Sequence, residues 1–583
     1  MENVNIKING LAVSAPKGST ILEATRIAGI EIPTLCFLKE INEIGACRMC
    51  VVEVKGARSL VASCVYPINE GMEIFTNSPK VLESRKMTLQ LILSTHKKEC
   101  LSCVRSGNCE LQTLCKEFRV EDENLFAGSM EETTIDNSAV HMYRDNSKCI
   151  DCRRCVAVCE KTQAVGVIGA NERGFKTNIG SAFEVGLGET SCISCGQCIA
   201  VCPTGAIAEK DNTADVWAAL ADTSKHVVVQ TAPAVRSAIA EDFGNPVGTN
   251  GEPQMIAALR RLGFAKVFDT DFSADLTIME EANEFLDRVK NGGKLPLITS
   301  CSPGWVKFCE HYFPDMLDNL SSCKSPMQMF GAITKTYYAE KMGIDPKDIV
   351  VVAVMPCTAK KFEIGRDDQD AAGVADVDIS ITTRELARMI KQAGIKFNDL
   401  PTDEKFDDPL GESTGAGVIF GATGGVMEAA LRTAVETLTG EELPCVDFVD
   451  VRGTDGIKTK TYEVAGMEIK VAVVSGLANA KELLTKVQNG EENYHFIEIM
   501  ACPGGCVNGG GQPQQPAYIR NTLDIRALRA SVLYNIDENM PLRKSHENPS
   551  IKKLYAEYLE APGSHKAHHI LHTTYVKRPI YSK

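Results

Sequence analysis

Two stretches of the sequence, "CIDCRRCVAVCE" at residues 149–160 and "CISCGQCIAVCPTGA" at residues 192–206, share one cysteine spacing. Each has the pattern Cys-x2-Cys-x2-Cys-x3-Cys, and the second continues directly into proline. Four thiolates at this spacing are the ligand set of a cubic iron–sulfur cluster, and an internal repeat of the set indicates two such clusters in one small domain. The repeat fits chance or a zinc site poorly.

The repeat predicts a bacterial ferredoxin-like domain over residues 138–212. In that arrangement the fourth cysteine of each half crosses to the cluster of the other half. One 4Fe-4S cluster is therefore expected on Cys149, Cys152, Cys155 and Cys202, and the other on Cys192, Cys195, Cys198 and Cys159.

The whole chain is rich in cysteine, with 23 in 583 residues, most of them before residue 203. No apolar run is long enough to span a bilayer and no leader is visible, so we expect a cytoplasmic protein, where disulfides are rare and grouped cysteines are metal ligands. The net charge of −14 and only two tryptophans argue against nucleic acid as a partner, and we expect no membrane partner either.

Upstream of the repeat, residues 1–80 are expected to form a β-grasp domain. "VNIKINGLAVSAP" (4–16) alternates around Asn-Gly, which indicates a hairpin, and "TILEATRIAG" (20–29) indicates a helix with a threonine cap. The domain contains four further cysteines: Cys36, Cys47, Cys50 and Cys64. Four thiolates suit a 2Fe-2S cluster, because each tetrahedral iron takes two of them. Structural zinc remains an alternative, although the first spacing is long for it.

Residues 81–137 contain a predicted helix, "SRKMTLQLILSTH" (84–96), and a second ligand group in a short loop. The group is His96, Cys100, Cys103 and Cys109. One imidazole and three thiolates suit either zinc or a 4Fe-4S cluster with one nitrogen ligand, and the residues alone do not decide between them. Cys115 lies outside the spacing and is expected to be a packed thiol.

Beyond the repeat, residues 213–583 alternate short apolar strands with helices, which favours an α/β domain with two sheet-based halves. Predicted strands lie in 226–235, 295–301, 349–357 and 469–476, and a helix lies in 382–394. Ligands of such domains bind at the carboxyl ends of strands. Three cysteine-bearing turns have this position: "TSCSPGW" with Cys301, "MPCTAKKFE" with Cys357, and "EIMACPGGCVNGGGQP" with Cys502 and Cys506.

These turns, the upstream cysteine groups and "GVIFGATGGVMEAALR" (417–432) resemble the iron-iron hydrogenases that carry several accessory clusters, over about residues 1 to 575. The resemblance implies an H-cluster: a 4Fe-4S cube joined through one cysteine sulfur to a two-iron unit with carbon monoxide, cyanide and a dithiolate amine. It implies Cys357, Cys502 and Cys506 as ligands, with Cys506 as the bridge. It also assigns a 4Fe-4S cluster to the His96 group.

The resemblance further implies roles for side chains around the two-iron unit. Met355 and Met500 are expected to pack around it, Lys360 to hydrogen-bond one cyanide, and Ala232 with Pro233 to lie beside the other. A proton path is implied from Cys301 through Glu281 and Ser321 to Glu284. Glu281 and Glu284 are one helical turn apart, so both can point the same way, although a solvated acidic face would show the same spacing.

The turn "TSCSPGW" departs from the pattern of that family, in which two adjacent cysteines precede Pro-x-Trp. The first relays protons and the second ligates the cube, which puts Cys301 at the relay position and Ser302 at the ligand position. Either Cys301 shifts to hold the cube and Ser302 relays protons, or Cys301 relays and the cube has a serine oxygen or an open iron. We favour Cys301 as the ligand here. A serine hydroxyl is a poorer iron ligand and a weaker acid than a thiol.

The expected function is reversible 2H+ + 2e− = H2 at the H-cluster, with electrons passing through one 2Fe-2S and three accessory 4Fe-4S clusters. Its partner is expected to be ferredoxin, flavodoxin or an NADH-oxidising flavoprotein subunit. An electron-transfer subunit without turnover and a hydrogen sensor are the alternatives. The histidine-rich segment "GSHKAHHILH" (563–572) is expected to serve packing and helix capping.

Overall fold

The chain begins with the predicted hairpin. A computed structural model describes residues 2–126, 133 and 135–581, in which β1 (Asn3–Ile8) pairs antiparallel with β2 (Leu11–Pro16). The turn residues Asn9 and Gly10 have φ of 49° and 86°, the positive values that a two-residue turn needs. The hairpin belongs to a five-stranded sheet of order β2-β1-β5-β3-β4, completed by β3 (Val51–Val54), β4 (Val61–Ala62) and β5 (Glu73–Phe75).

The predicted helix 20–29 is α1 (Ile21–Ile27), and Thr20 caps it. The Thr20 hydroxyl accepts a hydrogen bond from the Glu23 amide while the Glu23 carboxylate accepts one from the Thr20 amide, a reciprocal capping box. Two helices follow this β-grasp domain: α2 (Pro79–Leu93) and α3 (Glu110–Glu117). The predicted helix 84–96 is therefore confirmed as the larger part of α2.

The cysteine repeat lies on short elements between two small sheets. One sheet has the order β10-β7-β6 and the other pairs β8 with β9. The bounds of these elements are β6 (Ile135–Asp136), β7 (Met142–Asp145), β8 (Gly169–Asn171), β9 (Asn178–Gly180), β10 (Ile207–Glu209), α4 (Arg154–Ala157) and α5 (Gln197–Val201). In each half of the repeat the third cysteine lies in the short helix, and Cys159 lies in the π-helical turn Val158–Thr162 that continues α4.

The rest of the chain contains two four-stranded sheets, as the alternation of strands and helices predicts. The first has the order β12-β11-β14-β15 and is parallel throughout, with β11 (His226–Thr231), β12 (Lys266–Asp269), β14 (Ile349–Met355) and β15 (Ile379–Thr382). The second has the order β13-β18-β17-β16, with β13 (Leu297–Ile298), β16 (Ile457–Val464), β17 (Met467–Ser475) and β18 (Phe496–Met500). Only the β16–β17 pair in it is antiparallel.

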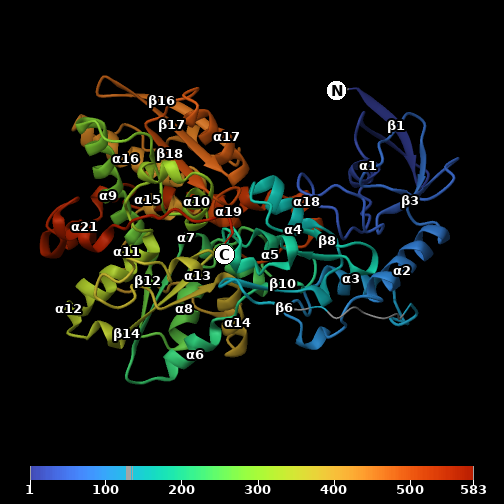
Figure 1. Ribbon diagram of the computed structural model, residues 1–583, viewed down its shortest axis with the longest axis horizontal. Helices are drawn as coiled ribbons and strands as arrows, with labels where there is room; N and C mark the ends of the chain where they lie inside the picture. The colour runs from blue at the N-terminus through green and yellow to red at the C-terminus, as the bar shows by residue number, and fades with distance from the viewer. Residues whose placement is uncertain (1, 127–132, 134, 582–583) are drawn as a thin grey trace.

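Helices cover both sheets. In Figure 1 the N-terminal elements lie to one side, blue to cyan, of the larger body formed by the two sheets and these helices. The helices are α6 (Thr213–Ala221), α7 (Pro233–Arg236), α8 (Glu252–Leu262), α9 (Thr270–Asn291), α10 (Pro303–Tyr312), α11 (Pro326–Ile333), α12 (Ala339–Met342), α13 (Lys360–Glu363), α14 (Thr383–Gln392), α15 (Gly415–Val418), α16 (Gly425–Thr439), α17 (Leu477–Gln488), α18 (Ala517–Thr522), α19 (Ile525–Asn539), α20 (Pro549–Leu554) and α21 (His565–Leu571).

The architecture is a multidomain α+β and α/β chain, as the sequence predicts. The largest apolar core lies between the first sheet and its helices, and a second core packs around β18 and α10. Among the residues that the structure describes, no helix combines the length and apolar character needed to cross a membrane.

Candidate active site

The four cysteines of the β-grasp domain converge on one point. The Cys47 amide donates to Cys36 Sγ at 3.5 Å, and the Sγ atoms of Cys50 and Cys64 are 3.3 Å apart. A hydrogen bond from the Cys36 thiol lowers the pKa of Cys47 to about 6, and one from the Cys64 thiol lowers that of Cys50 to about 7. Free thiols at this spacing, two of them inclined to ionise, fit the ligand set of a 2Fe-2S cluster.

His96 is ready to act as a neutral nitrogen ligand. Its Nδ1 is buried and has no hydrogen-bond partner among the described residues, and burial lowers the pKa of the imidazole to about 4. A deprotonated ring nitrogen without a hydrogen-bond partner, in the chain segment just before Cys100, is suited to bind a metal or cluster. The loop also approaches the end of the cysteine repeat closely, because a Cβ on Gly205 would lie 2.4 Å from Cys103 Sγ.

The two halves of the repeat cross over in space. Cys149, Cys152 and Cys155 of the first half line one cavity together with Cys202 of the second. The charge of Cys192 contributes to the raised pKa values of both Cys159 and Cys198, so Cys159 of the first half lies among the second group. These are the two groupings that the spacing predicts.

Two separate loops contact the cavity group formed by Cys149, Cys152, Cys155 and Cys202. From the β-grasp domain, Asn42 Nδ2 donates to the carbonyl oxygens of Cys36 and Cys152, each at 2.9 Å. From the His96 loop, Arg105 Nη1 donates to the Cys202 carbonyl at 2.9 Å. The ligand groups of the β-grasp domain and of the His96 loop therefore both contact the cavity group.

The other group of the repeat contacts the large α/β domain. Thr358 Oγ1 donates to the Ser194 carbonyl at 2.8 Å, and Gln197 Nε2 donates to the Asn508 carbonyl at 2.8 Å. Gly510 allows this approach, because a Cβ there would lie 2.2 Å from the Cys195 carbonyl oxygen. The loops that contain Cys195, Cys357 and Cys506 are thus in direct contact.

Four strands of the α/β domain deliver the residues of a buried site at their carboxyl ends. Met355 ends β14 and precedes Cys357 by two residues, and Met500 ends β18 and precedes Cys502 in the same way. Cys301 follows β13, and the Ala232-Pro233 turn follows β11. Both methionines are only 2% exposed, and Ala232 and Pro233 are buried.

Three cysteines of this site lie close to one another. Burial is the main cause of the raised pKa of Cys502, and the charges of Cys357 and Cys506 come next. Burial and then the charge of Cys357 raise the pKa of Cys506 to about 12. A Cβ on Gly505, which has a φ of 92°, would lie 2.6 Å from the Thr423 amide nitrogen, so the Cys506 loop can take this path only with glycine. Three neighbouring thiols, of which Cys502 is buried and Cys357 and Cys506 are partly exposed, lie on glycine-lined loops that fit a bulky cluster.

Cys301 and its neighbour Ser302 face different parts of the site. Burial raises the pKa of Cys301, and the charge of Glu281 is the next largest cause. The Ser302 hydroxyl instead accepts a hydrogen bond from the Ala501 amide at 3.2 Å, beside Cys502. The Cys301 thiol thus lies near both Glu281 and Cys506, whereas the Ser302 hydroxyl faces the Cys502 loop.

A row of acid and hydroxyl groups runs from Cys301 toward the protein surface. Glu281 on α9 is 2% exposed, and burial raises its pKa to about 8 although a hydrogen bond with Ser321 opposes this. The Ser321 hydroxyl donates to Glu284 Oε2 at 3.3 Å. Glu284 pairs with Arg288 at 2.5 Å, where both side chains keep some exposure. The predicted proton-path residues are therefore adjacent in the expected order.

Lys360 reaches the site from the first turn of α13. Its Nζ donates to Glu363 Oε2 at 2.6 Å, to Ser325 Oγ at 2.9 Å and to the Cys301 carbonyl at 3.4 Å. This places a buried ammonium next to the Cys301 turn, where it can interact with an anionic ligand.

Two residues that support the site were not predicted. Glu498, inside the apolar strand β18, accepts hydrogen bonds from the Gly424 and Met427 amides, each at 2.7 Å, and its charge acts on both Cys301 and Cys506. A lone carboxylate within the apolar run "FIEIM" was the available signal. Arg529 had no such signal, because it lies on an ordinary amphipathic helix.

Arg529 holds the Cys506 loop, so its replacement by leucine is expected to destabilise the domain. Its guanidinium binds Glu241 through two contacts of 2.7 Å and donates to the carbonyls of Val507 and Pro513. Both side chains are 1% exposed. Loss of one partner of a buried pair costs about 3–5 kcal/mol, so Arg529→Leu should lower the midpoint of anaerobic thermal unfolding. The control is Arg526→Leu on the same helix, which removes only an exposed ion pair with Asp524 and should leave the unfolding midpoint unchanged. Equal shifts in both variants would contradict the role of Arg529 in holding the Cys506 loop.

Comparison with known proteins identifies the fold around this site. Residues 225–510 match the family described as "Iron only hydrogenase large subunit, C-terminal domain", and residues 523–578 match "Iron hydrogenase small subunit". The chain is 52% identical to the NADP-reducing hydrogenase subunit HndD of Solidesulfovibrio fructosivorans, over 99% of this chain and 100% of the relative. The chain belongs to the iron-only, or [FeFe], hydrogenase family. Iron hydrogenase 1 of Clostridium pasteurianum is 45% identical over 98% of this chain and 100% of its own length.

The structural comparison agrees with this [FeFe] hydrogenase assignment. A variant of the HydA1 hydrogenase of Chlamydomonas reinhardtii aligns with a TM-score of 0.57 at 44% identity and covers 64% of this chain and 100% of the algal one. The N-terminal part matches other families: a 2Fe-2S cluster binding domain at 1–79, an NADH-ubiquinone oxidoreductase-G iron-sulfur binding region at 85–124, and a 4Fe-4S dicluster domain at 148–206. These matches favour iron–sulfur clusters over zinc. The predicted hydrogenase, with accessory iron–sulfur domains and an H-cluster domain, is confirmed.

Proposed function

We propose that this [FeFe] hydrogenase catalyses reversible 2H+ + 2e− = H2 at an H-cluster held by Cys357, Cys502 and Cys506. The observation that carries the proposal is the meeting of these three thiols at the carboxyl ends of β14 and β18, between a row of acids and a row of cysteine groups. When bound, the cluster supplies the redox-active irons and the carbon monoxide, cyanide and dithiolate amine ligands at which H2 is made or split. Cys506 is proposed as the bridging ligand.

Electrons are proposed to reach this site through one 2Fe-2S and three accessory 4Fe-4S clusters. The loops of successive ligand groups contact one another in space. The β-grasp group and the His96 group both contact the cavity group, and the Cys195 loop contacts the loops of Cys357 and Cys506. Carbonyl and side-chain contacts between successive groups keep the cofactors close and fixed, which electron transfer requires.

Protons are proposed to move along Cys301, Glu281, Ser321 and Glu284. Glu281 suits the role because burial raises its pKa to about 8, so the carboxyl both holds and releases a proton near neutral pH. Cys301 is the relay next to the cluster in this proposal, and Ser302 lies at the fourth ligand position of the cube. This reverses the role that the sequence favoured for Cys301, and its support is the contact of Ser302 with the Ala501 amide.

The remaining side chains of the site are proposed to hold the two-iron unit in place. Met355 and Met500 close the site with apolar, polarizable surface, and Lys360 donates to one cyanide. Ala232 and Pro233, at the end of β11, lie beside the other cyanide. Excluding water here protects the reactive irons from side reactions.

The electron partner is proposed to be an NAD(P)H-oxidising flavoprotein subunit or a ferredoxin or flavodoxin in the cytoplasm. The similarity to a subunit of an NADP-reducing hydrogenase and the match of residues 85–124 support the flavoprotein. A non-catalytic electron-transfer subunit is less well supported, because relatives named as hydrogenases align over the catalytic half as well.

Infrared spectroscopy of the anaerobically matured protein tests the proposal together with hydrogen evolution from reduced viologen. Carbon monoxide and cyanide bands with rapid turnover are expected, and Cys506→Ala should lose both while it keeps the paramagnetic signals of the accessory clusters. Bands without rapid turnover would instead indicate a hydrogen sensor. Accessory signals without bands would indicate an electron carrier.

A further inference from the structure

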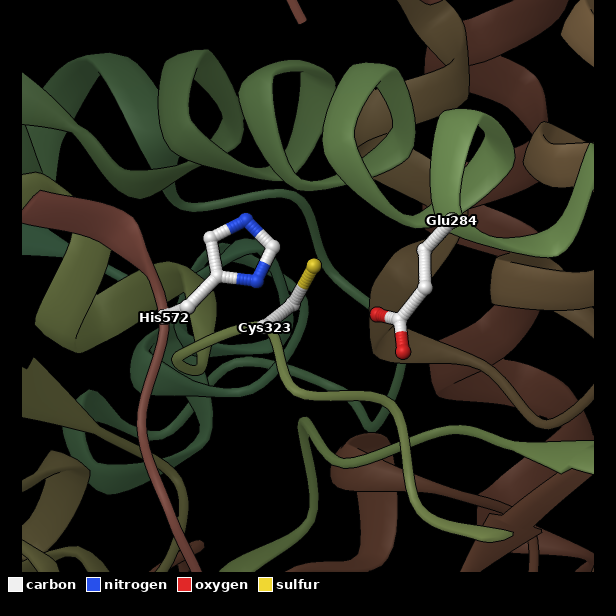
Figure 2. Close-up of side chains that lie close together, drawn as sticks. All are labelled: Glu284, Cys323 and His572. Carbon is white, nitrogen blue, oxygen red and sulfur yellow. The ribbon is translucent and has the colours of Figure 1, made fainter. Parts of the chain in front are cut away.

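Three potential metal ligands from distant parts of the chain meet at the outer end of the acid row. Glu284 comes from α9, Cys323 from the loop before α11, and His572 directly follows α21. One ligand atom of each lies within 4.8 Å of those of the other two. Figure 2 shows the imidazole, the thiol and the carboxylate directed toward a common space.

We propose that Glu284, Cys323 and His572 form a binding site for a thiophilic divalent cation such as Zn2+, whose binding arrests proton movement through Glu284. Carboxylate, thiolate and imidazole groups are the three kinds of side chain that bind Zn2+, whereas Ca2+ and Mg2+ prefer sites made of oxygen ligands. The binding stands on the geometry alone, whereas its effect on turnover rests on the proposed proton path.

The outer nitrogen of His572 already has the partner that a metal-bound histidine requires. His572 Nε2 lies 3.2 Å from Glu280 Oε2, and Glu280 is itself fixed by the Tyr555 hydroxyl at 2.5 Å and the Gly563 amide at 2.9 Å. A carboxylate on one ring nitrogen sets the tautomer and leaves the lone pair of the other nitrogen for a metal. That other nitrogen, Nδ1, is the one that faces Cys323 in Figure 2.

Ser322 presently bridges two of the ligands. Its hydroxyl oxygen lies 2.7 Å from His572 Nδ1 and 3.0 Å from Glu284 Oε2. A tetrahedral Zn2+ with bonds of about 2.0–2.3 Å needs its ligands closer together than the present separation. The cation would therefore take the place of the serine hydroxyl between imidazole and carboxylate, and small side-chain rotations would move the ligand atoms inward by about 1 Å.

The charges around the site favour a cation. Glu280 and Glu281 add two further carboxyl groups on α9, close in the chain to Glu284. Arg288 carries the opposing positive charge, and its guanidinium donates a hydrogen bond to the other carboxylate oxygen of Glu284, Oε1.

Occupancy would remove Glu284 from proton exchange, because a metal-bound carboxylate oxygen no longer accepts a proton. Ser321 donates to the same Oε2 atom that faces the site and accepts from the Cys323 amide. The cation would thus break the acid row at its outer end and leave the Cys301 end untouched.

Zinc K-edge absorption tests the binding on the full holoenzyme, because it reports zinc separately from iron. The background is Cys445→Ala, which removes an exposed thiol outside the cluster groups. With one equivalent of Zn2+ we expect one sulfur at about 2.3 Å and nitrogen or oxygen ligands at about 2.0 Å. The sulfur shell should vanish in Cys323→Ala and persist in Cys309→Ala, a matched control with another buried cysteine.

Hydrogen evolution from reduced viologen, measured on the same samples, tests the effect. We expect Zn2+ to slow turnover at least tenfold, reversibly by chelation, in the background and in Cys309→Ala but not in Cys323→Ala. A sulfur shell that persists in Cys323→Ala, or no sulfur shell at all, would overturn the site. Bound zinc with unchanged turnover would refute the arrest and remove Glu284 from the proposed proton path, while the infrared bands would show that the hydrogenase function itself stands.

Discussion

Ser302→Cys is expected to increase both the iron content per chain, by up to one cube, and the rate of hydrogen evolution, on the order of tenfold. The Ser302 side chain lies beside the Cys502 loop, where the Ala501 amide donates to its hydroxyl at 3.2 Å. A thiolate at this place gives the cube a fourth sulfur ligand in place of a weakly binding hydroxyl. Iron analysis, infrared band intensity and viologen-driven turnover measure the result.

Cys301→Ser separates the two roles of this turn. If Cys301 relays protons, as its position beside Glu281 indicates, the variant keeps its iron and its infrared bands but turns over slowly, because a serine hydroxyl is a much weaker acid than a thiol. Loss of cube iron in Cys301→Ser, with no gain in Ser302→Cys, would show that Cys301 is the ligand instead.

Glu281→Gln is expected to lower turnover by about a hundredfold or more. The amide can keep the hydrogen bond with Ser321, but it cannot take up and release a proton, so the route is interrupted at its centre. The infrared bands should stay, because the residue binds no iron. Asp287→Asn on the exposed side of the same helix is the control and should retain the wild-type rate. Comparable loss of rate in both variants would point to a general effect on α9.

The same substitution should change how stability depends on pH. The pKa of Glu281 rises from 4.5 to about 8 in the folded protein, so the folded state binds more protons than the unfolded state between these values. The free energy of unfolding therefore falls as pH rises through this window, and the stabilisation present below pH 4.5 is lost above pH 8. Glu281→Gln should flatten this slope in denaturation measured across the window. An unchanged slope would mean that Glu281 titrates normally.

Local sequence signals predicted the cysteine groups well, for a physical reason. Hairpin and helix starts depend on neighbouring residues, as the Asn9-Gly10 turn and the Thr20 cap show. A cluster that binds consecutive cysteines also leaves a local spacing, and even the crossing of Cys202 to the first group follows from the repeat.

Contacts between distant segments were not predictable in the same way. Glu284, Cys323 and His572 come together only because α21 packs against α11, and the histidine-rich segment was expected to serve packing and helix capping. The different directions of Cys301 and Ser302 depend on the Ala501 amide, which lies 199 residues away in the chain. Arg529 binds a loop and a carboxylate, and its helix gives no sign of either. Such roles follow from tertiary packing, which the sequence pattern does not record.

On the proposed electron path, the contact of both the Asn42 and the Arg105 loops with one cavity group gives electrons two entry points that join at one cluster. Two electron donors of different kinds can then reduce the same active site, each through its own entry cluster. Loss of one entry cluster removes one electron donor and leaves the other in use. Loss of the cluster at Cys149, Cys152, Cys155 and Cys202, or of the Cys195 group that follows it, disconnects both donors at once, so substitutions should be tolerated least at these two groups.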